Sequence, residues 1–89
     1  MTRVRAFQVA ANEDGFVEVN RVEDGSAVWL RSKLPDVGTN FHKRLCLDGL
    51  THSATIYWQT VGAQCDSKTF RTVASFQEWL GSHPHSGQS

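Results

Sequence analysis

Hydrophobic and polar residues alternate along several short stretches near the start of the chain, a pattern typical of strands that bury one face. We predict strands at residues 3–10, 16–22 and 27–32. The two segments between them, residues 11–15 and 23–26, both contain Asp and Gly, and the first also contains Asn; these residues tolerate the positive φ of tight turns. The first third of the chain is therefore predicted to be a meander of antiparallel strands.

The middle of the chain is less regular. A proline and a glycine interrupt residues 34–40, which we interpret as a crossing loop. Residues 41–47 fit a strand that turns Leu45 and Leu47 inward, or a short helix capped by Asn40. We prefer the strand, because the run is short and an Asp-Gly pair follows it.

The next segments predict a hairpin. Residues 54–61 are rich in β-branched and aromatic side chains, which favours a strand. A hairpin loop at residues 48–53 precedes this strand, and a second loop at residues 62–67 follows it. Residues 68–71 then form a short strand that holds Phe70.

The carboxy-terminal segment carries the signals of a helix over residues 73–80. Thr72 is a suitable N-cap, and Phe76 and Leu80 fall on one stripe of the predicted helix. Gly81 suits the C′ position, where a left-handed conformation costs little. About two helical turns are too short to persist alone. The helix is therefore expected to pack on the sheet.

These elements predict an α+β fold: an antiparallel sheet of five to six strands with one C-terminal helix packed on one face. Residues 1–82 are expected to form a single domain, because 89 residues suffice for one modest core. Residues 83–89 are polar and are expected to form a flexible tail.

Composition and charge disfavour several classes of function. The nine basic and nine acidic residues cancel, so the chain lacks the positive field that favours nucleic-acid binding. No apolar run approaches the ~20 residues of a membrane span, and the first residues lack the apolar segment of a signal peptide. The two cysteines make no disulfide framework. We therefore expect a cytoplasmic protein without a membrane partner.

The residues that could carry chemistry do not form a recognisable site. The candidate metal ligands lack the paired short spacings of metal sites; they are His42, Cys46, His52, Cys65, His83 and His85. Cys65 has Asp66 beside it and no histidine that the sequence brings near, which disfavours a nucleophilic thiolate. We predict no catalytic residue, no cofactor and no metal.

Aromatic residues point instead to binding. One short helix covers only one face of a sheet, so some of the nine aromatic rings are expected on the surface, where interface energy concentrates. The predicted binding residues are Trp29, Arg31, Arg44, Tyr57, Trp58 and Trp79. They would present a sheet face or edge to a protein partner, or to a second copy in a homodimer.

Two alternatives remain open. The same aromatic residues, with Lys33 and Lys43, would suit a single-stranded nucleic acid, although the zero net charge disfavours that partner. A small ligand would instead occupy a pocket between helix and sheet, near Trp58 and Phe76. The size and the order of elements resemble those of orphan accessory proteins carried by phages, integron cassettes and other mobile elements. This resemblance is one of layout and carries no site residues across.

Overall fold

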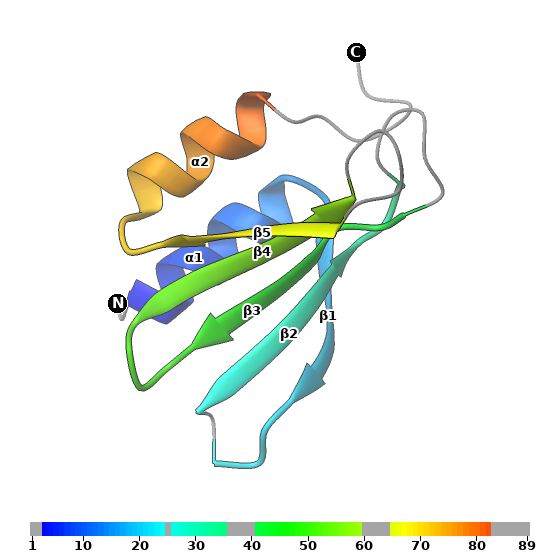
Figure 1. The fold of residues 1–89 in the computed structure, drawn as a ribbon. Coiled ribbons are helices and arrows are strands. Elements are labelled where there is room, and N and C mark those ends of the chain that lie inside the picture. Colours follow the sequence, from blue (N-terminus) through cyan, green and yellow to red (C-terminus); the bar gives the residue numbers. More distant parts are fainter. Residues whose placement is uncertain (1–2, 25, 36–40, 60–64, 83–89) are drawn as a thin grey trace.

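Five strands form one antiparallel sheet in the order in which they follow along the chain. The structure is a computed structural model, and it describes residues 3–24, 26–35, 41–59 and 65–82. The elements are α1 (Arg3–Glu13), β1 (Phe16–Arg21), β2 (Ala27–Ser32), β3 (Arg44–Asp48), β4 (Ser53–Gln59), β5 (Cys65–Phe70) and α2 (Val73–Ser82). The predicted α+β meander with a C-terminal helix is confirmed (Figure 1).

Helix α1 corrects the sequence-based prediction, which placed a strand at residues 3–10 and a turn at residues 11–15. Phe7, Ala10 and Ala11 are all buried, and their spacing of three and four residues is that of one helical face. The alternation of Phe7 with Val9 suggested a strand, but the Val9 side chain is 38% exposed. The chain turns only after Glu13, where Gly15 takes a φ of 96°.

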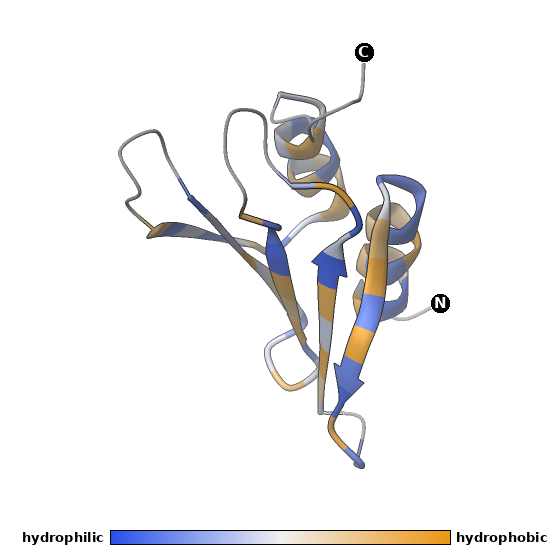
Figure 2. Cartoon of the chain, turned by 90° about the vertical axis from the view of Figure 1, so that its right-hand side faces the viewer, coloured by the Kyte–Doolittle hydropathy of each residue, from blue (hydrophilic) through white to orange (hydrophobic). Residues whose placement is uncertain are grey.

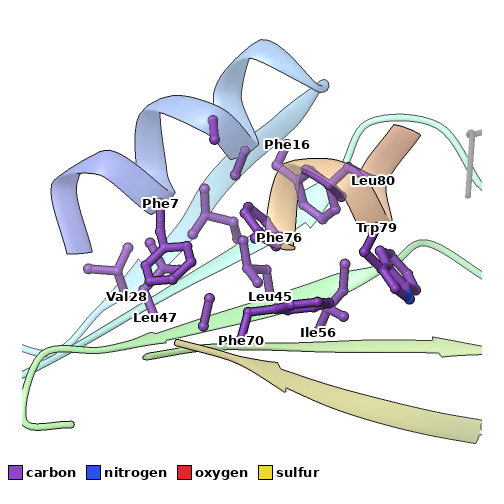
Figure 3. Packing of buried hydrophobic residues seen from close by; sticks show 14 residues of the cluster. Phe7, Phe16, Val28, Leu45, Leu47, Ile56, Phe70, Phe76, Trp79 and Leu80 are labelled. Carbon is purple, nitrogen blue, oxygen red and sulfur yellow. The ribbon is translucent and has the colours of Figure 1, made fainter. Parts of the chain in front are cut away.

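Both helices lie on the same face of the sheet, as two views of the ribbon show (Figures 1 and 2). Phe7 of α1 and Phe76 of α2 meet edge to face, with ring centroids 5.5 Å apart. The ring centroid of Phe70 of β5 lies 5.6 Å from that of Phe76 (Figure 3). Three aromatic rings thus join the two helices to the sheet, above a floor of buried aliphatic residues: Val28, Leu30, Leu45, Leu47 and Ile56.

Helix α2 agrees with the prediction at its start and extends beyond it at its end. The Thr72 hydroxyl oxygen accepts a hydrogen bond from the Ser75 N–H at 3.3 Å, as an N-cap does. Phe76 and Leu80 are buried, as expected. The helix continues through Gly81 to Ser82, so the predicted C′ role of Gly81 is wrong. Gly81 has no left-handed φ, and nothing there approaches the position of a Cβ.

The remaining strands lie close to their predicted ranges. Residues 41–47 contain most of β3, so the preferred strand is confirmed. Strand β5 begins at Cys65 and not at residue 68, because residues 65–67 continue the register with Gln59, Trp58 and Tyr57. The predicted loop at residues 62–67 is therefore wrong for its second half. Residues 36–40, 60–64 and 83–89, which include the predicted tail, lie outside the described residues.

Candidate functional site

The sheet has a second face, which no helix of the described chain covers (Figure 1). Side chains alternate along each strand, so the residues between the buried core positions point away from the helices. Hydropathy accordingly changes in bands along the strands (Figure 2). We call this surface the open face and define it by Val17, Asn20, Trp29, Arg31, Arg44, Cys46, Asp48, Thr55, Tyr57, Gln59, Cys65, Ser67 and Thr69.

One row of cross-strand neighbours runs across all five strands of the open face. The register pairs Arg31 with Arg44 directly, and Arg44 in turn with Tyr57. Val17 and Ser67 complete the row at its two ends. Directly opposite side chains have Cβ atoms ~5 Å apart, so the two arginine side chains leave the sheet next to each other, at its centre.

The two arginines have no acidic neighbour in the described parts of the chain. Both are exposed, and neither makes an ion pair with any described residue. The Arg21–Glu18 salt bridge, at 2.6 Å, belongs to the covered face, because Glu18 pairs with the inward-facing Leu30. Like charges placed directly opposite each other on a sheet are destabilising.

Asp48 is the one carboxylate on the open face among the described strands, and it serves a turn. Its Oδ1 accepts hydrogen bonds from the N–H groups of Leu50 and Thr51, at 2.8 and 3.2 Å. These bonds stabilise the ionised form and hold the pKa of Asp48 below its ordinary value. The centre of the open face therefore carries positive charge, although the chain as a whole is neutral.

Two aromatic rings lie beside the arginines. The Trp29 and Tyr57 rings are nearly parallel, with an interplanar angle of 22° and centroids 6.2 Å apart, although they come from β2 and β4.

Cys46 of β3, the register partner of Trp29, is half-buried. Burial, followed by the charge of Asp48, raises the pKa of its thiol. A raised pKa disfavours the thiolate, which is the reactive form of cysteine.

A shallow hollow of about 470 Å³ lies next to the rings, lined by Val19, Asn20, Trp29, Leu30, Arg31 and Arg44. Val19 and Asn20 were not among the predicted binding residues. They reach this place because the β1–β2 register shifts between Glu18 and Asn20. Such a bulge redirects side chains. The sequence of β1 contains no glycine or proline that would have indicated it.

The structure places the six predicted binding residues on two different faces. Trp29, Arg31, Arg44 and Tyr57 gather on the open face. Trp58 and Trp79 instead meet on the covered face, with ring centroids 4.9 Å apart, and Trp79 is only 8% exposed. These two tryptophans help to close the core between α2 and the sheet.

The two alternative partners, a single-stranded nucleic acid and a small ligand, were expected to contact Lys43 and Phe76 respectively. Both residues lie away from the open face. Lys43, one of the lysines expected beside a nucleic acid, is 2% exposed and lies one residue before β3. The Phe76 ring itself packs against the rings of Phe7 and Phe70. A hollow of about 390 Å³ lies between α2 and β5, and its lining includes Phe70, Ser75 and Trp79.

Other kinds of site find little support in the described residues. Within these ranges, no group of three or more His, Cys, Asp or Glu residues is arranged to hold a metal ion. The described helices include none with both the length and the apolar character needed to cross a membrane.

A stability measurement tests whether the two arginines repel each other. Arg44→Gln removes one charge and keeps a similar chain length, so we expect the free energy of unfolding to rise by roughly 0.2–1 kcal/mol at low ionic strength. The gain should shrink in high salt, because both side chains are exposed. Arg44→Lys keeps the charge and should show no gain. Chemical denaturation gives the values, and a loss of stability in Arg44→Gln at low salt would contradict this interpretation.

Comparisons of this chain with protein-family models, with curated proteins and with solved structures find no match.

Proposed function

We propose that this chain is a non-enzymatic binding module that presents the open face to an extended, acidic segment of a partner protein. The observation that carries the proposal is the direct pairing of Arg31 with Arg44, without an acidic neighbour in the described residues. Carboxylates of a partner would neutralise both charges. Arginine suits this role because its planar guanidinium binds a carboxylate through two parallel hydrogen bonds.

The aromatic pair supports binding of a chain across the strands. Trp29 and Tyr57 lie on either side of β3, within reach of the same segment that would contact Arg44. Trp, Tyr and Arg are the residue types in which interface energy concentrates. Tyr57 is 37% exposed in the isolated chain and has surface left to bury.

Charge argues against a second copy as the occupant of the open face. Two open faces packed against each other would bring Arg31 and Arg44 of one copy towards the same two residues of the other. Juxtaposed like charges cost several kcal/mol at an interface. The partner must instead bring negative charge.

A single-stranded nucleic acid is the second candidate, and the Trp29–Tyr57 pair favours it. Aromatic rings on a sheet surface stack with successive bases, at ~1–3 kcal/mol per base, and arginines bind the phosphates. The open face offers only Arg31 and Arg44 as cations among its described residues, and the chain has no net charge. We therefore rank this partner below an acidic protein segment.

Titration with two probes separates the candidates. A short polyglutamate peptide and an oligothymidine of equal charge are each added to the protein, and Trp fluorescence or calorimetry reports binding. We expect polyglutamate to bind and the double variant Arg31→Gln/Arg44→Gln to bind it at least about tenfold more weakly, since hydrogen bonds to charged groups contribute ~1.5–3 kcal/mol. Arg71→Gln, a matched change outside the open face, should bind as the native chain does.

Each outcome of the titration decides between the candidates. Binding of oligothymidine alone, with loss in the same double variant, would replace the acidic segment by a nucleic acid. Binding of neither probe at low ionic strength, or binding that the double variant retains, would contradict the use of Arg31 and Arg44.

A further inference from the structure

Strand β5 forms one edge of the sheet and is exposed along most of its length. Residues 65–69 are all exposed, and β5 pairs with β4 without interruption from Cys65 to Phe70. A straight, exposed edge strand presents free backbone N–H and C=O groups to another strand. The edge is therefore available for pairing, except at the Ser67 N–H, which donates to Asp66 Oδ1 at 2.8 Å and would have to exchange this bond for one to the second strand.

The opposite edge of the sheet is protected. Strand β1 has a register shift between Glu18 and Asn20, and bulges of this kind discourage pairing. Glu18 is further held by Gln8 of α1 at 3.0 Å and by Arg21 at 2.6 Å. The two edges thus differ, and an association through strand pairing would use β5.

Strand β5 carries one acidic and one basic residue, at equal distances from Ser67. Asp66 and Lys68 flank Ser67 and lie on the same face, in register with Trp58 and Ile56. Neither is in a salt bridge within the described chain. Lys68 Nζ lies 5.4 Å from the Phe70 ring centroid, and Asp66 Oδ1 accepts the Ser67 N–H at 2.8 Å.

We propose that two copies of this chain associate through their β5 edges, antiparallel, with Ser67 opposite Ser67. In this register Asp66 of each copy lies directly opposite Lys68 of the other, which gives two cross-strand pairs of opposite charge. Charged residues on an edge strand usually discourage pairing. Here they favour one register only, because a shift by two residues in either direction places Asp66 opposite Asp66 or Lys68 opposite Lys68.

The symmetry of this dimer has a structural consequence. A two-fold axis through the Ser67 pair stands perpendicular to the sheet, so the two sheets join into one and both open faces lie on the same side. Two Arg31–Arg44 pairs would then share one surface. A long acidic partner could contact both, and the second contact would form at a high effective concentration. The dimer itself does not depend on the proposed function.

Variants that reverse the charge of Asp66 or Lys68 test this arrangement, and the molecular mass in solution is the quantity measured. Sedimentation or light scattering should show the native chain as a dimer at high protein concentration and as a monomer on dilution. Asp66→Lys and Lys68→Asp each place like charges in both cross-strand pairs, so each variant should dimerise more weakly, on the order of tenfold. The double variant Asp66→Lys/Lys68→Asp restores both pairs with reversed charge and should dimerise again.

A mixture provides the matched control. Equal amounts of Asp66→Lys and Lys68→Asp should form a heterodimer, because every pair between these two chains joins opposite charges. Both positions changed here, Asp66 and Lys68, are exposed, so circular dichroism should show an unchanged fold. A native chain that remains a monomer at the highest concentration would overturn the proposal. So would a dimer that neither single variant weakens, or a double variant that stays monomeric.

Discussion

Phe76→Ala is expected to lower the free energy of unfolding by about 3–5 kcal/mol, which is the usual cost of truncating a fully buried aromatic side chain. The Phe76 ring is 0% exposed and lies against Phe7 of α1 and Phe70 of β5 (Figure 3). Its loss would leave a cavity where both helices meet the sheet. A domain of this size has a total stability of only ~5–10 kcal/mol, so the variant should be partly unfolded at moderate temperature.

Denaturant titration followed by circular dichroism measures this effect. Gln77→Ala, a change at the exposed neighbouring position, serves as the control and should stay within about 0.5 kcal/mol of the native chain. If Phe76→Ala lost no more stability than this control, α2 would not be held to the sheet by this ring.

Val9→Pro is expected to cost about 3 kcal/mol or more, because Val9 lies inside α1. Proline there removes a backbone N–H that the helix uses and brings its ring against the preceding turn. Detachment of α1 would also expose Phe7, Ala10 and Ala11, which are buried against the sheet and α2. Thermal unfolding gives the size of the loss.

Val9→Ala distinguishes a helix from the strand that the sequence predicted. Alanine is the better helix former, so the exposed Val9→Ala should be neutral or stabilise by up to ~0.5 kcal/mol. In a strand the same change would be destabilising, because β-branched residues are favoured there. A clear loss of stability in Val9→Ala would therefore contradict the assignment of α1.

Strands were predicted correctly where the alternation of apolar and polar residues coincided with β-branched and aromatic side chains. Residues 27–32 alternate and contain β-branched and aromatic side chains, and they form β2 with the predicted bounds. At residues 3–10 the alternation of Phe7 and Val9 fitted a strand equally well. The buried residues Phe7, Ala10 and Ala11 have the spacing of a helix. Ala11 lies beyond residues 3–10, the segment in which the strand was predicted. Short apolar runs leave this ambiguity between helix and strand.

The open face could be predicted only in part. Trp29 and Arg31 are two residues apart on one strand, so the sequence alone places them on the same face. The same rule separates Tyr57 from Trp58, but it does not say which of the two faces the helices. That choice depends on tertiary packing, which places Trp58 against Trp79, where it is partly buried.

The pairing of the two arginines needed the strand register. Arg31 and Arg44 lie on different strands, joined by a connection that includes residues outside the described ranges. Nothing in the local sequence states that they are direct neighbours. The zero net charge of the chain also pointed away from an anionic partner, because charge summed over the chain does not show how charges divide between two faces.

The indole N–H signals of the three tryptophans, followed by NMR while polyglutamate is added, test the central claim most directly. Trp29 lies on the open face beside Tyr57, whereas Trp58 and Trp79 pack together on the covered face. The account predicts that the Trp29 indole signal shifts with saturation while the other two stay in place. A shift of the Trp58 or Trp79 signal with Trp29 unmoved would place the binding surface elsewhere and contradict the account.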